Sequence, residues 1–180
     1  TLSSISKIEV RRRAETEDLI HTFTNVTPGQ QLTFTDNGAL DGFNTYIITA
    51  YSGDEAGEPA ERRAYIGFDI PGMPTDVRAT SGRDAITVDW KAPSTLGVNG
   101  GYVEPDELTY NIYTLDLEAL DFVILKEGVK GLSYQPQVPM YGVQDLHYFA
   151  VSGVSDVGEG EYEASNLVIS GAPYTLPFRE

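Results

Sequence analysis

Residues 147–161 read HYFAVSGVSDVGEGE, and residues 44–59, NTYIITAYSGDEAGEP, follow the same pattern about 102 positions earlier. Each stretch alternates apolar and polar residues and then enters an acidic turn that contains serine and glycine. Alternation with a period of two indicates a β-strand with one buried face. KIEVRR (7–12) matches TYNIYT (109–114) at the same offset. The repeat therefore predicts two copies of one small β-domain.

The second copy is the more complete of the two. In AITVDWK (85–91), Ile86, Val88 and Trp90 alternate with polar residues, which predicts a half-buried strand. With six further short strands expected between positions 75 and 169, the count is typical of a two-sheet sandwich of about 100 residues. The predicted structural core contains Trp90, Tyr110, Ile112 and Val151 in the second copy and Tyr46 in the first.

The first copy lacks the front of this pattern. Only six residues precede KIEVRR, whereas about 35 precede its match in the second copy. Two strands have no counterpart, so an apolar face of the first copy is expected to be open, and uncovered apolar strands pair with other chains. The sequence leaves open whether a partner copy supplies these strands by strand exchange, whether they are unresolved, or whether they were cut off. The residues expected on the open face are Ile8, Val10, Phe34, Tyr46 and Ile48.

Several motifs of the second copy occur in a recognisable order. They are PGMPTDVRAT (71–80), a tryptophan followed by a proline in ITVDWKAP (86–93), a tyrosine in LTYNIY (108–113), and a strand that leads into SDVGEG (155–160). In this order they resemble the fibronectin type III domain. The resemblance implies an all-β fold of two consecutive immunoglobulin-like β-sandwiches, of which the first lacks strands A and B. His147 stands where the family has a tyrosine, which departs from the family pattern.

The resemblance also implies a domain organisation. Residues 1–70 match strands C to G of an incomplete domain, residues 71–172 match a complete one, and residues 173–180 are similar to a linker that enters a following domain. Three further stretches are TLSSISKIEVRRR (1–13), TNVTPGQQLTFTDNGALDGFNTY (24–46) and IPGMPTDV (70–77). Together they resemble tandem modules of large bacterial surface and secreted proteins of the adhesin type. We therefore expect an extracellular or cell-surface location, with the export signal upstream of Thr1.

The charge of the chain is strongly acidic. Its 180 residues include 27 acidic and 12 basic side chains, for a net charge of −15. Such a chain repels phosphate backbones, so nucleic acid is not an expected partner. The absence of cysteine excludes disulfides, thiolate metal sites and a cysteine nucleophile. No run reaches the ~18 apolar residues that a membrane span needs.

No arrangement of residues predicts catalysis, a cofactor or a metal site. Ser155 in GVSDVG lacks the glycine two positions later that a nucleophile elbow needs. The two histidines, His21 and His147, belong to different copies and have no converging partners in the sequence. DNGALDG (36–42) carries carboxylates but fails the spacing of an EF-hand loop. The sequence therefore predicts a protein that is not an enzyme.

The connection between strands B and C of the second copy is the candidate recognition loop. It spans residues 92–107, and connections of this length are often functional. In the family topology the B–C and F–G loops emerge at the same end, where a tyrosine among polar residues suits stacking on a sugar or anchoring a protein. The alternative is that apolar loop residues fold back over the end of the sandwich. The candidate binding residues are Asn99, Tyr102, Glu104, Val157 and Glu159.

These observations favour a non-catalytic interaction and spacer module within a larger protein. Its expected partners are other domains of the same polypeptide and host or bacterial proteins or glycans. The alternative is a carbohydrate-binding accessory domain beside a glycan-degrading enzyme. Loss of glycan binding in Tyr102→Ala would favour the alternative, and the absence of binding to any glycan would favour the spacer.

Overall fold

The computed structural model describes residues 4–171, which form β-strands joined by turns and one short 3-10 helix. Two compact units divide the chain, Thr1–Phe68 and Asp69–Glu180. The all-β fold class predicted from the sequence is confirmed. The linker predicted at residues 173–180 lies outside the described residues.

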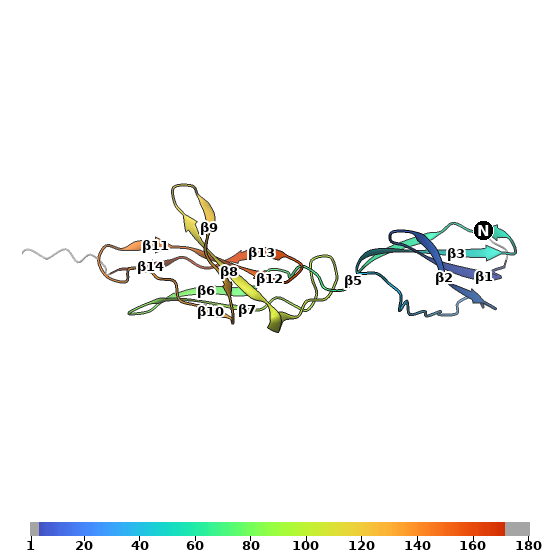
Figure 1. Ribbon diagram of the computed structural model, residues 1–180, viewed down its shortest axis with the longest axis horizontal. Helices are drawn as coiled ribbons and strands as arrows, with labels where there is room; N and C mark the ends of the chain where they lie inside the picture. The colour runs from blue at the N-terminus through green and yellow to red at the C-terminus, as the bar shows by residue number, and fades with distance from the viewer. Residues whose placement is uncertain (1–3, 172–180) are drawn as a thin grey trace, which may run out of the picture. The chain divides into compact units, whose positions relative to one another are not determined.

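The first unit contains one antiparallel sheet (Figure 1). Its strands are β1 (Lys7–Arg13), β2 (Glu17–Thr24), β3 (Gly42–Ser52), β4 (Glu55–Ala56) and β5 (Ala60–Ile66). The order across the sheet is β2-β1-β3-β5, and the short β4 pairs with the end of β3. This is the order of strands C′, C, F and G in the family. Residues 4–68 form no second sheet, as predicted for a unit without strands A and B.

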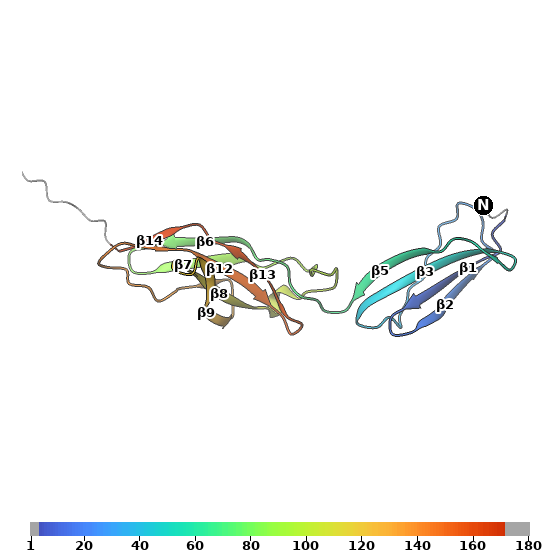
Figure 2. The same ribbon diagram turned by 90° about the horizontal axis from the view of Figure 1, so that it is seen from above.

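The second unit contains both layers of a sandwich (Figure 2). One sheet has the order β10-β7-β6 and the other has the order β13-β12-β8-β9, which correspond to strands E-B-A and G-F-C-C′. A ribbon of β11 and β14 extends the second layer at one end. The elements are β6 (Thr75–Ser81), β7 (Ile86–Lys91), η1 (Pro105–Glu107), β8 (Thr109–Asp116), β9 (Asp121–Val129), β10 (Ser133–Tyr134), β11 (Asp145–His147), β12 (Phe149–Val154), β13 (Glu159–Ala164) and β14 (Val168–Ser170).

The pairing of the strands has the same register in both units. Strand β1 pairs with β3 so that Val10 faces Ile48, and β8 pairs with β12 so that Ile112 faces Val151. Each central strand also pairs with the strand that follows it, β2 or β9. The repeat in the sequence therefore corresponds to a repeated four-stranded sheet.

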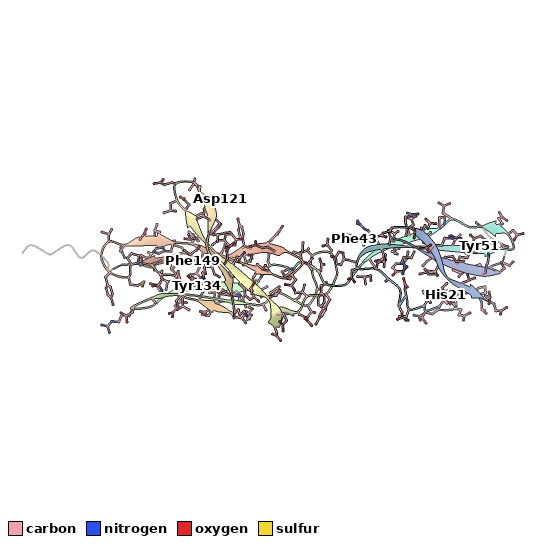
Figure 3. All side chains as sticks on the ribbon, in the orientation of Figure 1. His21, Phe43, Tyr51, Asp121, Tyr134 and Phe149 are labelled. Carbon is pink, nitrogen blue, oxygen red and sulfur yellow. The ribbon has the colours of Figure 1, made fainter. Side chains whose placement is uncertain are left out.

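The hydrophobic core lies between the two sheets of the second unit. Trp90 on β7 packs against Tyr110 on β8 with ring centroids 5.2 Å apart. Phe149, labelled in Figure 3, is 1% exposed between the layers. Burial of each of these large rings stabilises the folded state by about 1.5–3 kcal/mol. The buried residues of the cluster are Val77, Ala79, Ile86, Val88, Trp90, Val103, Leu108, Tyr110, Ile112, Phe149, Val151 and Val168.

The first unit has no comparable core. Among its described residues, the buried apolar side chains are Val10 and Ile47. Ile48 and Phe34 are 42% and 40% exposed, as expected for an open face, whereas the burial of Val10 differs from that expectation. Tyr46, expected in the core, is only half-buried. A single sheet has one face without a partner, so few side chains can leave water.

The segment between β2 and β3 lies over part of this open face. Phe34 stacks on His21 of β2 with ring centroids 4.3 Å apart. Asp36 accepts hydrogen bonds from Arg12 at 2.9 Å and from the hydroxyl of Tyr46 at 3.1 Å. This segment corresponds to strand E, which pairs with strand B in the second unit. Without that partner its backbone forms no strand, and side chains alone attach it to the sheet.

The strand expected to close the second unit is divided into two. Strand β13 ends at Ala164, and β14 begins at Val168 and pairs with β11. His147 on β11 lies 2.8 Å from the Ser170 hydroxyl on β14, so the histidine in place of the family tyrosine joins these two strands. This contact gives His147 a structural role.

Gly160 on β13 permits a close approach of two backbones. A Cβ atom at this position would lie 2.1 Å from the carbonyl oxygen of Pro71. We expect Gly160→Ala to lower the free energy of unfolding by about 1–3 kcal/mol, because β13 must move away from Pro71. Thermal unfolding followed by circular dichroism measures this change. Gly72→Ala is the matched control, since a Cβ there meets no atom within 4 Å, and an equal effect of both variants would contradict the prediction.

Candidate functional site

The end of the second unit is organised around the carboxylate of Asp69. One oxygen accepts hydrogen bonds from the backbone N–H groups of Asn99 at 2.7 Å and Gly101 at 3.0 Å. The other accepts from the Asn99 side-chain amide at 2.8 Å and from the Ile70 N–H at 2.7 Å. Asp69 is 1% exposed. Its carboxylate thus fixes the B–C connection as a closed loop.

The turn between β12 and β13 joins the same cluster. The hydroxyl of Ser155 donates to the backbone carbonyl of Asp69 at 3.3 Å, and the N–H of Val157 donates to that hydroxyl. The structure therefore brings the B–C and F–G connections together at one end, with Asn99 in the hydrogen-bonded centre. Tyr102 and Val157 are 48% and 45% exposed.

Two of the candidate binding residues lie apart from this centre. Glu104 precedes η1, and its carbonyl accepts from the N–H of Glu107. The side chain of Glu159 points to the outer surface of the sheet, where it contacts β8 and β12 rather than the loop tip. Of the expected cluster, the tip therefore contains Asn99, Tyr102 and Val157.

Asp69 was missed by reasoning from the sequence. It stands before Pro71 in a stretch that reads as a connection between two domains, and nothing local marks it as buried. In the structure a Cβ at Gly97 would lie 2.5 Å from the Asp69 side chain, but a single glycine in the sequence does not reveal this contact. Burial by itself would raise the pKa of Asp69, but hydrogen bonds from Asn99, Gly101 and Ile70 outweigh it and hold the pKa of this carboxyl below its ordinary value.

A second candidate surface covers the outer side of the sheet β13-β12-β8-β9. We call it the aromatic face and define it by Tyr113, Phe122, Ile124 and Tyr162. The ring of Tyr162 lies 5.4 Å from that of Tyr113 and 5.3 Å from that of Phe122. Ile124, which pairs with Tyr113, is 52% exposed. The sheet thus presents apolar side chains from three of its strands to solvent.

Small residues on β12 explain why these rings come together. Ala150 and Ser152 alternate with the core residue Val151, so they point outward, yet both are 0% exposed. Their small side chains leave room for larger ones from β8, β9 and β13 to cover the middle of the sheet. The aromatic face is therefore a packed layer on the outside of the sandwich.

The carboxylate of Glu159 lies beside the aromatic face and is held in one orientation. Its Oε1 atom accepts hydrogen bonds from the side-chain amide of Asn111 at 3.0 Å and from the hydroxyls of Tyr113 and Ser152. Burial by itself would raise the pKa of Glu159, but these three hydrogen bonds outweigh it and lower the pKa. Burial, together with the hydrogen bond to Glu159, raises the pKa of Tyr113. Glu159 is therefore a fixed, ionised acceptor at neutral pH.

Within residues 4–171, no group of three or more histidine, aspartate or glutamate side chains is placed to hold a metal ion. A shallow hollow at the edge of β6 is lined by Val77, Arg78, Ala79, Thr80 and Asn166. There the Asn166 side-chain amide pairs with the backbone of Ala79 at 3.0 and 2.9 Å, so it covers the strand edge. No helix in the described part of the chain could span a membrane.

No protein-family profile matches the chain, and no curated protein matches it by sequence. Among solved structures, the FN1–FN3 domains of chicken CNTN1 are 17% identical, with a TM-score of 0.42; the match covers 92% of this chain and 56% of that one. This chain thus spans little more than half the length of that structure.

Two further solved structures match the chain at low sequence identity. The chicken interferon gamma receptor alpha chain is 11% identical with a TM-score of 0.47, and the match covers 96% of this chain and 88% of the receptor chain. The sixth fibronectin type III domain of human fibronectin type III domain containing protein 3 is 21% identical with a TM-score of 0.40, covering 63% and 96%. The strand order of its own sheets makes this chain all-β and fibronectin type III-like in fold.

Proposed function

We propose that the chain is a non-catalytic interaction and spacer module of a larger extracellular protein, of the type found on bacterial surfaces. The observation that carries the proposal is the aromatic face of the second unit. A sandwich of this kind buries its apolar residues between its sheets, and an exposed apolar group on the outside contributes little to that core. Exposed apolar patches rimmed by polar residues mark contact surfaces. The partner is a protein that docks on this face.

Site-specific photocrosslinking tests this role. The chain carries a photoreactive phenylalanine analogue at position 162. It is crosslinked while it is present on intact cells of the source organism. The matched control carries the analogue at position 143, because Val143 is 92% exposed and its backbone lies beside Gly171, after the end of β14. We expect adducts of one defined mass from position 162 and none from position 143. Equal labelling at both positions, or none at either, would exclude a contact surface here.

A carbohydrate-binding accessory role is the second candidate function. Tyr102 at the tip is 48% exposed, and aromatic rings next to polar groups are suited to stacking on sugars. A glycan array separates the two sites. Binding that disappears in Tyr102→Ala supports a sugar site at the tip, and binding that disappears in Tyr162→Ala supports one on the aromatic face. The absence of glycan binding leaves the protein-contact role as the function.

We also propose that the open face of the first unit takes part in strand exchange with a second copy of the chain. Ile48 is 42% exposed on this face, and β2 and β5 each have one unpaired edge in the described sheet. Uncovered apolar strands favour such pairing. We expect the chain to dimerise with rising concentration in sedimentation velocity, and Ile48→Lys to sediment as a monomer. A monomer at every concentration without the substitution would contradict strand exchange.

A further inference from the structure

On the outer face of the first unit, basic side chains contact a carboxylate and two aromatic rings. Glu9 on β1 is 8% exposed and lies 2.7 Å from the Lys7 ammonium and 3.4 Å from the Arg11 guanidinium. The same Lys7 ammonium lies 4.4 Å from the ring centre of Tyr51. An anion and an aromatic ring on this sheet are thus both satisfied by one basic side chain.

A second cation lies over an aromatic ring at the other end of β3. Figure 3 shows Phe43 and Tyr51 at opposite ends of this strand. The Arg63 guanidinium lies 3.5 Å from the ring centre of Phe43. Each of these two aromatic residues of β3 therefore has a cation over its ring. Lys7 of β1 lies over Tyr51, and Arg63 of β5 lies over Phe43.

The corresponding sheet of the second unit also has a carboxylate, Glu159, and aromatic rings, those of Tyr162 and Phe122. Within the described residues, no basic side chain pairs with this carboxylate or lies over these rings. All three hydrogen bonds of Glu159 come from uncharged donors and converge on Oε1. The ion pairs described for residues 69–171 are Arg83 with Asp84 and Lys91 with Asp76, none of which involves the aromatic face. Within the same residues, no basic side chain lies over the ring of Tyr162 or Phe122.

From this contrast we propose that the aromatic face of the second unit binds an arginine side chain presented by a partner protein. The guanidinium pairs with Glu159 through Oε2, the oxygen that carries none of the internal hydrogen bonds, and stacks on Tyr162. Arginine suits the site better than lysine because its planar group can pair with a carboxylate and cover a ring together. The net charge of −15 attracts basic partners over longer distances. The inference rests on the interaction role proposed above for the same face.

The ring geometry favours this ligand over a sugar. The planes of Tyr113 and Tyr162 are inclined by 42°, and those of Phe122 and Tyr162 by 58°. A flat platform for a polysaccharide needs rings that are nearly coplanar, whereas inclined rings enclose a single side chain. The Tyr113 hydroxyl is also already committed to Glu159.

A titration followed by nuclear magnetic resonance tests the proposal. The labelled chain of 180 residues is titrated with a blocked peptide, Gly-Ser-Arg-Ser-Gly, and with the same peptide carrying uncharged citrulline in place of arginine. We expect shifts in the signals of β8, β12 and β13, and about tenfold weaker binding of the citrulline peptide, in line with loss of one ion pair and one cation–π contact.

Variants assign the binding to the proposed residues. Glu159→Gln and Tyr162→Ala should each weaken binding of the arginine peptide about tenfold. Glu161→Gln is the matched control, because it removes the same charge from the same strand, and it should change the affinity by less than about twofold. The spectrum of each free variant shows whether it is folded, and Glu159→Gln, which keeps the size of the side chain, carries the test if Tyr162→Ala is not.

Three results would overturn the inference: equal binding of the citrulline peptide, equal weakening by Glu159→Gln and Glu161→Gln, or no binding of the arginine peptide. Binding of a glycan that Tyr162→Ala abolishes, without peptide binding, would replace arginine by a sugar as the ligand. These outcomes are independent of the crosslinking experiment, where failure at position 162 would instead remove the interaction role itself.

Discussion

Replacement of Trp90 by alanine should lower the free energy of unfolding of the second unit by about 3–5 kcal/mol. Trp90 is 4% exposed and contacts Tyr110 across the two sheets, so its removal leaves a cavity that the surrounding strands cannot close. It is the only tryptophan of the chain, so its fluorescence cannot report on the variant. Urea unfolding followed by far-ultraviolet circular dichroism measures the change.

The control for this variant is Leu96→Ala in the B–C connection. Leu96 is 63% exposed, so its truncation should alter the free energy of unfolding by less than about 0.5 kcal/mol. A loss below about 1 kcal/mol in Trp90→Ala would mean that the sheets pack together without this ring.

The second large effect is expected for Asp69→Asn. The substitution keeps the shape of the side chain but replaces one oxygen by an NH₂ group, which must face an N–H donor. Because four N–H groups converge on this buried carboxylate, we expect a loss of about 2–4 kcal/mol in the free energy of unfolding. The Gly101 amide donates to Asp69 in the natural chain, so its hydrogen exchange should become faster in Asp69→Asn as the B–C connection opens.

The pH dependence of stability provides an independent measurement of the same contact. The folded state lowers the pKa of Asp69 below its unfolded value of about 3.9, so the folded state favours the ionised form. Its contribution is therefore fully present above about pH 4 and is lost as the pH falls through the folded pKa. Stability should fall more steeply below pH 4 in the natural chain than in Asp69→Asn. Asp156→Asn, an exposed position in the F–G turn, should leave the slope unchanged, and identical slopes for all three chains would contradict this role of Asp69.

In the first unit, the sequence repeat predicted the strands and their shared face correctly, but it did not predict how deeply the residues on that face are buried. Alternation in residues 7–12 and 44–59 predicted two strands and a shared face, and the register that pairs Val10 with Ile48 places them on one face. The same reasoning placed Tyr46 in a core, where it is only half-buried. Alternation identifies the side of a strand, but burial needs a second layer above that side, and residues 4–68 provide a loop instead of a sheet.

The candidate sites were predicted less completely than the fold. The resemblance to the fibronectin type III domain implied that the B–C and F–G connections emerge at one end, and in the structure the Ser155 hydroxyl of the F–G turn bonds to the carbonyl of Asp69 beside the B–C connection. It did not identify Asp69, whose partners Asn99 and Gly101 are 30 and 32 positions away. It also assigned Glu159 to the tip, whereas an irregular pairing between β12 and β13 directs its carboxylate to the outer face.

The sequence by itself determined the all-β class, the repeat and the identity of core positions such as Trp90 and Ile112, because these follow from periodicity along a single strand. Only the tertiary structure decided which outward-facing residues are neighbours. Tyr113, Phe122 and Tyr162 come from three strands, and they meet because Ala150 and Ser152 are small enough to be covered. Beside these rings, the Glu159 carboxylate is bonded by uncharged donors, whereas Glu9 on the matching sheet of the first unit is paired with Lys7 and Arg11. A binding surface of this kind depends on the order, register and bulges of several strands together, which no pattern within one strand contains.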